Sequence, residues 1–349
     1  MMKKKISVLM VLILAGLLNP LYAEEIVIKV VDETREVLVG ADVVIEFVGF
    51  TQVKSKAHYG KTNKKGEYGV SGKIQFNGVY VRVGKDGYYD SIKEGGFLPN
   101  KDHKATLVLR RIERPVPLYV RDVFLEFPIF DEWLGFDFEV GDWVAPQGKG
   151  KSRDILFKFH REYMGSKYSA KKLKEVTEIS KRFAERRKEE WNPDIFELQT
   201  AKWRSELIIK FPSEFDGMVE EKSGYLPYSK MKMPHLAPKE GYREDEVVIK
   251  KKTYRTEKDE RENLEEMRSY VKNGVPEIKP TGYFIRTRVT EVDGKIIKAN
   301  YAKLPKMIGV GAAGSINFIY YFNPVVNDRN LEYQPKSNLA TEQRRFYDP

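Results

Sequence analysis

The chain has 349 residues, contains no cysteine and carries a formal net charge of +10. The absence of cysteine excludes disulfide bonds, thiolate nucleophiles and any metal site that needs a cysteine ligand. Its 61 Lys and Arg residues are mixed along the chain with 51 Asp and Glu residues. This mixture favours solvated surfaces and argues against nucleic acid as a partner.

Residues 1–23 have the pattern of an export signal. Three lysines at positions 3–5 precede an apolar run from Ile6 to Leu18, and Ala23 offers a cleavage point. That run is shorter than the ~20 residues that span a bilayer as a helix, and no later stretch predicts a transmembrane segment. We therefore expect a mature chain that begins at Glu24 and is located in the periplasm or outside the cell.

Residues 24–113 have the alternation and turn signals of a small β-sandwich. Apolar alternation marks strands at 24–31, 37–47 and 79–83, and turns are predicted at Asn63–Gly66 and Lys85–Tyr88. We expect successive strands to pair as hairpins. A final strand at residues 105–109 should close the domain as an edge strand.

The order of these signals resembles the carboxypeptidase regulatory-like domain, a transthyretin-like sandwich appended to secreted bacterial proteins. The matching elements are Val31-Asp32, Gly40-Ala41-Asp42-Val43, the hairpin from Thr62 to Tyr68, and Gly87-Tyr88. The resemblance implies a spacer, stabilising or adhesive domain that has no catalytic residues of its own. It implies no cofactor.

Proline residues at 115 and 117 predict a linker, and residues 114–349 are expected to form a second, β-rich domain. This part resembles uncharacterised exported bacterial proteins in which a regulatory-like domain precedes a β-rich region. Helical spacing of apolar residues, among them Val176, Ile179 and Phe183, predicts a helix at 169–190 that Asn192-Pro193 ends, and a second helix is predicted at 256–272. Both are expected to lie on a sheet, and the alternative is that either apolar stripe binds a membrane or a partner. The fold class is therefore mainly β, with helical insertions. Strands are predicted by alternation at 119–127, 135–140, 282–290, 295–301 and 315–322, with an Asp293-Gly294 hairpin.

Two glycine-rich segments match loose nucleotide-binding patterns. Residues 145–152 read Ala-Pro-Gln-Gly-Lys-Gly-Lys-Ser, and residues 309–314 read Gly-Val-Gly-Ala-Ala-Gly. The first lacks a helix that would direct its N-terminus at phosphate, and the second has too few residues after it for a βαβ unit. We interpret the first as a basic hairpin and the second as a loop of close backbone approach.

No catalytic or metal constellation is marked out by spacing. The four histidines are far apart in the sequence, so no metal site is predicted, and no Gly-x-Ser-x-Gly elbow is present. A Ser/His/Asp triad could still assemble in space. Asp142, Asp154 and Asp216 could pair as the carboxylates of a glycoside hydrolase.

The remaining candidates are side chains that could form a ligand surface. Aromatic rings beside acids can hold sugars, which directs attention to Trp133, Trp143 and Asp142, and Asp328-Arg329 form a polar turn. A core role for the tryptophans and an ion pair at the turn are the alternative interpretations. The sequence favours a non-catalytic exported protein that binds an envelope protein or an extracellular glycan, or serves as a structural component. The alternative is an extracellular carbohydrate-active hydrolase with its site in the second domain.

Overall fold

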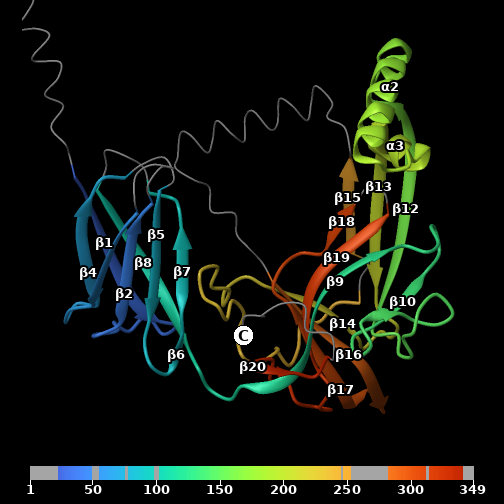
Figure 1. Cartoon of the computed structure of the whole chain (residues 1–349). Coiled ribbons are helices and arrows are strands. Elements are labelled where there is room, and N and C mark those ends of the chain that lie inside the picture. Colours follow the sequence, from blue (N-terminus) through green and yellow to red (C-terminus); the bar gives the residue numbers. More distant parts are fainter. Residues whose placement is uncertain are drawn as a thin grey trace, which may run out of the picture. The chain divides into compact units, whose positions relative to one another are not determined.

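The structure is a computed structural model that describes residues 23–48, 55–74, 78–97, 102–244, 247–252, 282–311 and 314–340. The expected export signal and the expected helix at 256–272 lie outside these ranges. The chain divides into two compact units, both drawn in Figure 1. The N-terminal unit runs to Ile112 and also includes Leu226–Lys232, and the C-terminal unit comprises Glu113–Tyr225 and the residues from Met233 onward. No helix in the described ranges is long and apolar enough to cross a membrane.

The N-terminal unit is a sandwich of two four-stranded sheets, as the sequence predicts. One sheet has the order β4-β1-β8-β6 and the other β3-β2-β5-β7. Their inward-facing residues, such as Ile28, Ile45 and Leu107, are fully buried and belong to one apolar cluster. The strands are β1 (Glu24–Asp32), β2 (Asp42–Phe47), β3 (Lys56–Lys61), β4 (Glu67–Gly72), β5 (Val79–Gly84), β6 (Tyr88–Tyr89), β7 (Ser91–Glu94) and β8 (His103–Arg111).

The pairing of these strands differs from the expected hairpins. β1 pairs with β4 and runs parallel to β8, whereas β2 pairs with β3 and β5 in the other sheet. The turns after β1 and β3 therefore connect the two sheets, and β8 lies between β1 and β6 instead of at an edge. The prediction of an edge strand at 105–109 is wrong because alternation reveals which face of a strand is buried but not its neighbours.

A short segment from the second half of the chain, Leu226–Lys232, belongs to the N-terminal unit and is here called the strap. The backbone N–H of Ile92 donates to the Tyr228 carbonyl at 2.8 Å, and the Lys230 N–H donates to the Asp90 carbonyl at 2.9 Å. Met231 is fully buried. The strap thus extends the sheet beyond β7 and covers an edge that would otherwise expose unpaired backbone groups.

The C-terminal unit contains a five-stranded sheet of order β11-β10-β12-β13-β15 and a larger sheet of order β14-β16-β17-β19-β9-β20, with β18 paired to β19. All five strands predicted by alternation are present. The expected linker is shorter than predicted, because Pro117 already belongs to β9. The strands are β9 (Val116–Glu126), β10 (Leu134–Asp137), β11 (Asp142–Trp143), β12 (Ile155–Ser166), β13 (Ala201–Lys210), β14 (Gly217–Glu221), β15 (Val247–Lys252), β16 (Gly282–Val292), β17 (Lys295–Leu304), β18 (Gly309–Gly311), β19 (Ser315–Asn323) and β20 (Tyr333–Asn338).

Aromatic rings join the two sheets of the C-terminal unit. Phe136 of β10 lies with its ring centroid 5.2 Å from that of Phe318 of β19, and Phe138 lies 4.8 Å from Tyr320. All four side chains are buried. Each large aromatic side chain removes 150–250 Å² from water, so this cluster is the main apolar core of the unit.

Two turns illustrate how local sequence sets the larger sheet. Asp293 and Gly294 both have positive φ, 53° and 74°, which is the backbone of a tight type I′ hairpin. They join β16 to β17, and the predicted hairpin is confirmed. Gly309 lies in β18, where a Cβ atom would stand 2.2 Å from the Asn317 side chain. The Asn317 side chain thus occupies the space that a Cβ atom at position 309 would need.

A pair of helices connects β12 to β13 and projects beyond the ends of these strands (Figure 1). Residues 169–200, here called the arm, contain α2 (Ala170–Arg187) and α3 (Pro193–Thr200). Ser169 caps α2 by accepting the Lys172 N–H, and Lys188 ends it in a left-handed conformation. The helix predicted at 169–190 is confirmed. Its expected packing on a sheet is wrong, because no residue of α2 is buried.

The strap makes a testable contribution to the N-terminal unit. Residues 24–112 should fold cooperatively alone, and a peptide of residues 225–233 should raise their melting temperature, because burial of one Met side chain contributes ~2 kcal/mol. Thermal unfolding followed by circular dichroism measures this shift. The same peptide with Met231→Asp is the control. A random-coil spectrum, or equal shifts with both peptides, would contradict the prediction.

Candidate functional site

One arginine of the C-terminal unit is surrounded by carboxylates, and these four side chains are here called the Arg288 network. Arg288 Nε donates to Asp154 Oδ1 at 2.6 Å and Nη2 to Asp154 Oδ2 at 2.9 Å. Nη2 also reaches Asp137 Oδ1 at 3.3 Å, and Nη1 donates to Glu139. The pairing of β16 with β17 shifts its register after Thr287, and Arg288 has a φ of 55°. Such an irregularity is a β-bulge, and β-bulges change the direction in which a side chain points.

Burial and hydrogen bonding set the charges of the network. Burial opposes ionisation of Asp137, but four backbone N–H groups donate to its carboxylate and together hold its pKa below the ordinary value. Burial also works against the charge of Arg288, yet its bonds to Asp154 and the nearby negative charges outweigh that effect and raise its pKa. The network is thus an internal charged cluster that ties β16 to β10 and to the start of β12.

The loop that resembles a phosphate-binding motif is part of this arrangement. The backbone N–H groups of Lys151 and Ser152 donate to Asp137 Oδ2 at 2.8 and 2.9 Å, and Lys149 N–H donates to Asp142 Oδ2 at 3.0 Å. The chain after Ser152 enters β12 and forms no helix there. Carboxylates therefore accept the amides that a phosphate loop would offer to its nucleotide.

The carboxylates considered for hydrolysis are mostly buried. Asp154 is 0% exposed, and Asp216 is 3% exposed and accepts the Val289 N–H at 3.1 Å. Burial, reinforced by the charge of Asp154, raises the pKa of Asp216 to about 6. The acid and base of a glycosidase flank a sugar and a water molecule. These two side chains instead face the protein interior.

Trp143 and Asp142 have internal roles. Trp143 is only 3% exposed, its ring packs on Phe127 and Phe136, and its Nε1–H donates to the Glu126 carbonyl at 3.0 Å. Its proposed place on a ligand surface is therefore corrected: this ring is core. Asp142 accepts the backbone N–H of Trp143 at 2.8 Å and holds the following loop.

The other sequence candidates lie in different surroundings. Asp328 pairs with Arg114 at 3.0 Å, and Arg329 Nη1 donates to the Ala237 carbonyl at 2.6 Å, so both stabilise the turn between β19 and β20. Trp133 retains a 38% exposed ring. The ammonium group of Lys158 lies 4.8 Å from its centroid. Of the two tryptophans named from the sequence, Trp133 is the one that reaches the surface.

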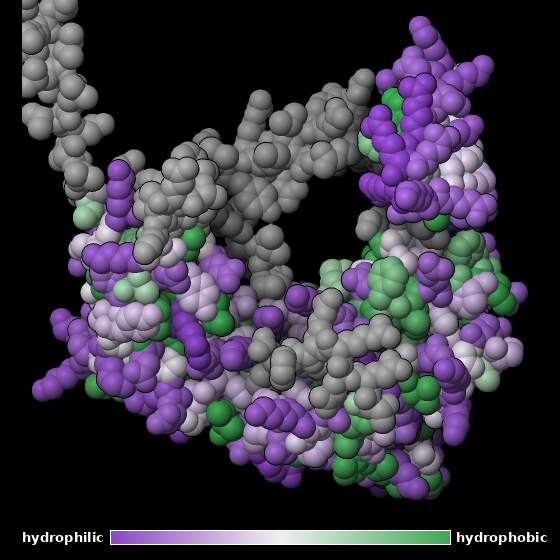
Figure 2. Space-filling view, viewed as in Figure 1, coloured by the Kyte–Doolittle hydropathy of each residue, from purple (hydrophilic) through white to green (hydrophobic). Residues whose placement is uncertain are grey.

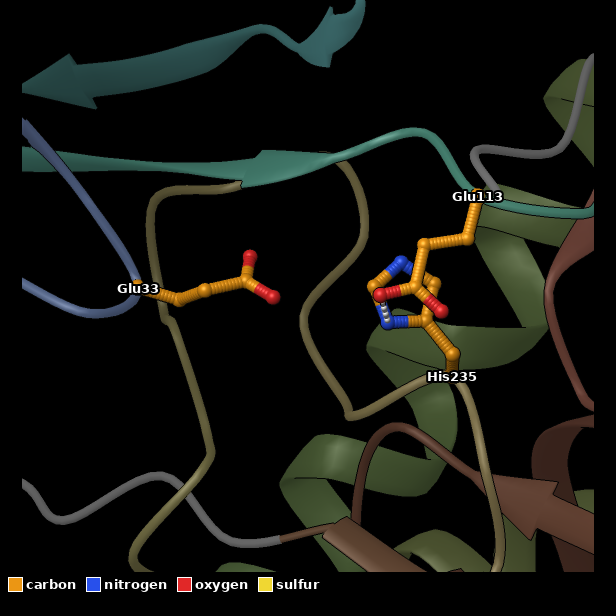
Figure 3. A group of neighbouring side chains, drawn as sticks. All are labelled: Glu33, Glu113 and His235. Atoms are coloured by element: carbon orange, nitrogen blue, oxygen red, sulfur yellow. Dashed lines mark ion pairs between the residues drawn. The ribbon is translucent and has the colours of Figure 1, made fainter.

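Among the histidines, His235 lies between two carboxylates of the C-terminal unit. Its Nδ1 is 3.9 Å from Glu113 Oε1 and its Nε2 is 3.9 Å from Glu332 Oε1, and Figure 3 shows the ring beside Glu113. Glu332 also accepts the backbone N–H groups of Glu113 and Arg114 at 2.9 and 2.6 Å. These contacts fix the start of the C-terminal unit. Glu33, also drawn, belongs to the N-terminal unit.

A groove on the arm encloses about 510 Å³. Ile179 and Phe183 of α2 are 48% and 52% exposed, and Ile195 of α3 is 53% exposed. Figure 2 shows hydrophobic residues between hydrophilic ones on the arm. The lining of the groove combines polar residues, among them Arg187, Glu190 and Gln199, with apolar side chains of both helices and their connection, namely Val176, Ile179, Phe183, Trp191, Ile195 and Phe196. Contiguous exposed apolar surface is typical of interaction sites, so this groove is the candidate functional site of the C-terminal unit.

The sequence predicts α2, which forms one side of this groove, but α3, which forms the other side, was not predicted. The stripe with Val176, Ile179 and Phe183 was recognised, but it was expected to pack on a sheet. Asn192-Pro193 was interpreted only as a helix end. The side chain of Asn192 accepts the N–H groups of Asp194 and Ile195 and so begins α3. Asn followed by Pro and Asp is a helix-start signal that could have revealed it.

Comparisons with known proteins identify no family for this chain. No family model matches the chain, and no curated protein matches it. Three solved structures have similarity at low TM-score. A Streptococcal ancillary pilin is 15% identical at TM-score 0.19, over 44% of this chain and 57% of its own. A "putative carbohydrate binding protein" from Bacteroides uniformis is 10% identical at TM-score 0.19, over 87% and 98%.

The third structure is a "putative membrane-associated protein of unknown function" from Bacteroides fragilis. It is 10% identical at TM-score 0.21, over 87% of this chain and 96% of its own. The similarity to the pilin, in contrast, covers 57% of the pilin's own length. TM-scores this low carry no argument about function. The function is therefore inferred from the side chains of this protein.

Loss of the arginine should strongly destabilise the C-terminal unit. Arg288→Met leaves buried carboxylates without their cation, and breaking such a pair typically costs about 3–5 kcal/mol. Lys151→Ala, which keeps the backbone bond to Asp137, should change the free energy of unfolding by less than ~0.5 kcal/mol. Urea unfolding at pH 7 compares the two. If both variants lose the same small amount of unfolding free energy, the Arg288 network does not stabilise the fold.

The raised pKa of Asp216 predicts how the stability of the fold depends on pH. Its folded-state pKa of about 6 lies above the ordinary 3.8, so the folded chain retains a proton that the unfolded chain releases. The free energy of unfolding should therefore fall as pH rises from about 4 to 6. Asp216→Asn should remove this fall and stabilise the protein at pH 7 by up to about 3 kcal/mol.

Urea unfolding at pH 4, 5, 6 and 7 measures the difference between wild type and Asp216→Asn. Asp293→Asn, in an exposed turn, serves as the surface control. A gain that is the same at every pH, or a loss of stability that grows with pH, would refute the assignment.

Proposed function

We propose that the chain is an exported, non-catalytic binding protein that docks a protein surface in the groove of the arm. The observation that carries this proposal is the exposure of Ile179, Phe183 and Ile195 on helices that project from the unit instead of packing on it. Keeping such side chains in water is unfavourable by ~25 cal/mol per Å² of apolar surface. A partner that covers them gains this energy.

The acidic side chains support binding over hydrolysis. Asp154 is paired with Arg288, Asp142 accepts the backbone N–H groups of Trp143 and Lys149, and Asp216 is buried. The carboxylates considered for catalysis therefore stabilise the fold. Apolar side chains, which usually lie in a protein core, are instead exposed on the arm. Export and the regulatory-like identity of the N-terminal unit belong to this proposal. In it the N-terminal sandwich is a spacer or stabilising domain.

Site-specific photo-crosslinking tests the arm as the binding surface. A benzophenone amino acid at position 183 should give a discrete protein adduct in the producing cells. The same group at position 59, where Tyr59 is 76% exposed in the N-terminal unit, should not give this adduct. Adducts that are identical from both positions, or absent from position 183, would contradict the proposal.

A matched pair of substitutions shows that the adduct depends on the groove. Ile195→Asp places a charge in the groove and should abolish the adduct from position 183. Val292→Asp changes a residue of equal exposure, 53%, outside the arm and should leave the adduct in place. Retention of the adduct by both variants would mean that the contact at position 183 is nonspecific.

A further inference from the structure

The arm separates its charges between its two halves. α2 carries seven basic and three acidic residues, a net charge of +4, whereas residues 189–200 carry four acidic residues and no basic one, a net charge of −4. The four acids are Glu189, Glu190, Asp194 and Glu197. The α2 half of the arm is thus basic overall, and the half formed by residues 189–200 is acidic overall.

These charges are not neutralised by pairing between the two helices. The ion pairs that α2 makes, Lys172 with Glu175 and Lys181 with Glu178, lie within that helix. Within the described part of the arm, no ion pair joins α2 to residues 189–200. Arg187 and Glu190 instead both line the groove. The charged residues at the rim of the groove are therefore Arg187 on the α2 side and Glu189 and Glu190 in the connection.

A partner of uniform charge does not suit such a rim. An anionic membrane would attract α2 but repel residues 189–200, and an acidic helix would meet the same conflict. The complementary partner carries an apolar centre with a basic and an acidic flank in opposite order. A second copy of the arm, turned by a two-fold rotation, presents this arrangement.

We propose that the arm is a self-association surface, in which α2 of one copy packs against α3 of the other. This inference rests on the proposed function, since it names the protein surface that covers the groove. Phe183 and Ile195 form the apolar centre of the contact, and Arg182, Arg186, Glu190 and Glu197 form its flanks. Antiparallel helices packed through such a centre form a four-helix arrangement.

A charge exchange tests this contact directly. One variant, Arg182→Glu with Arg186→Glu, lowers the net charge of α2 from +4 to 0 and leaves residues 189–200 at −4. The other, Glu190→Lys with Glu197→Lys, raises the net charge of residues 189–200 from −4 to 0 and leaves α2 at +4. Opposite charges then face each other only when the two variants are mixed. By analytical ultracentrifugation the wild-type chain should have twice the monomer mass at ~100 μM, each variant alone should be monomeric, and an equimolar mixture should form a heterodimer.

Phe183→Asp should be monomeric alone and in every mixture, while Val292→Asp should remain dimeric. Circular dichroism verifies that each variant keeps the helical content of the wild type. Mass equal to the monomer for the wild type, or dimers that persist in both charge variants, would overturn the inference. If the wild type is monomeric, an adduct from position 183 to another protein would still leave the proposed function intact. The absence of any such adduct would remove both.

Discussion

The contact on which the C-terminal unit depends is the burial of the Arg288 guanidinium among carboxylates. Arg288 comes from β16 in one sheet, whereas Asp137 and Asp154 come from β10 and the start of β12 in the other. Aromatic packing holds the sheets together, but it does not specify a single register because apolar contacts are non-directional. A bidentate ion pair supplies the direction. Its cost of desolvation is offset only when all partners are present.

The same network also holds the neighbouring acidic and glycine-rich segments in the fold. Asp137 accepts the amides of Lys151 and Ser152, so the glycine-rich loop is shaped by an internal carboxylate. Asp154 and Asp216 are likewise turned inward. With the acids committed to the fold, the surface chemistry of the C-terminal unit lies in the apolar groove and the divided charges of the arm. In the proposed function, the carboxylates stabilise the fold and the arm binds the partner.

Local signals predicted the elements well. Asp293-Gly294 has the turn residues that a two-residue hairpin requires, and the stripe with Ile179 and Phe183 has helical period, so both elements were found. The same stripe was assigned to the wrong surroundings, because amphipathicity shows that a face is apolar and does not show whether this chain or another covers it. The packing of α2 was therefore beyond local reasoning.

Contacts between distant residues could not be predicted. The bond between Asp137 and Arg288 spans 151 positions, and nothing near either residue indicates the other. The strap was missed for the same reason: Tyr228 lies in a proline-containing loop, and its carbonyl pairs with Ile92. Trp143 carried a surface and a core interpretation, and only its surroundings in space show that it is core. These outcomes depend on the assembled fold.

Hydrogen exchange at two protein concentrations tests the central claim, that the function of this unit lies in the arm and that a second copy covers it. Amides within 170–200 should exchange more slowly at 100 μM than at about 1 μM, because dilution dissociates the contact, while amides of β16 and β17 should exchange at the same rate at both concentrations. Equal exchange of the arm at both concentrations would contradict the account.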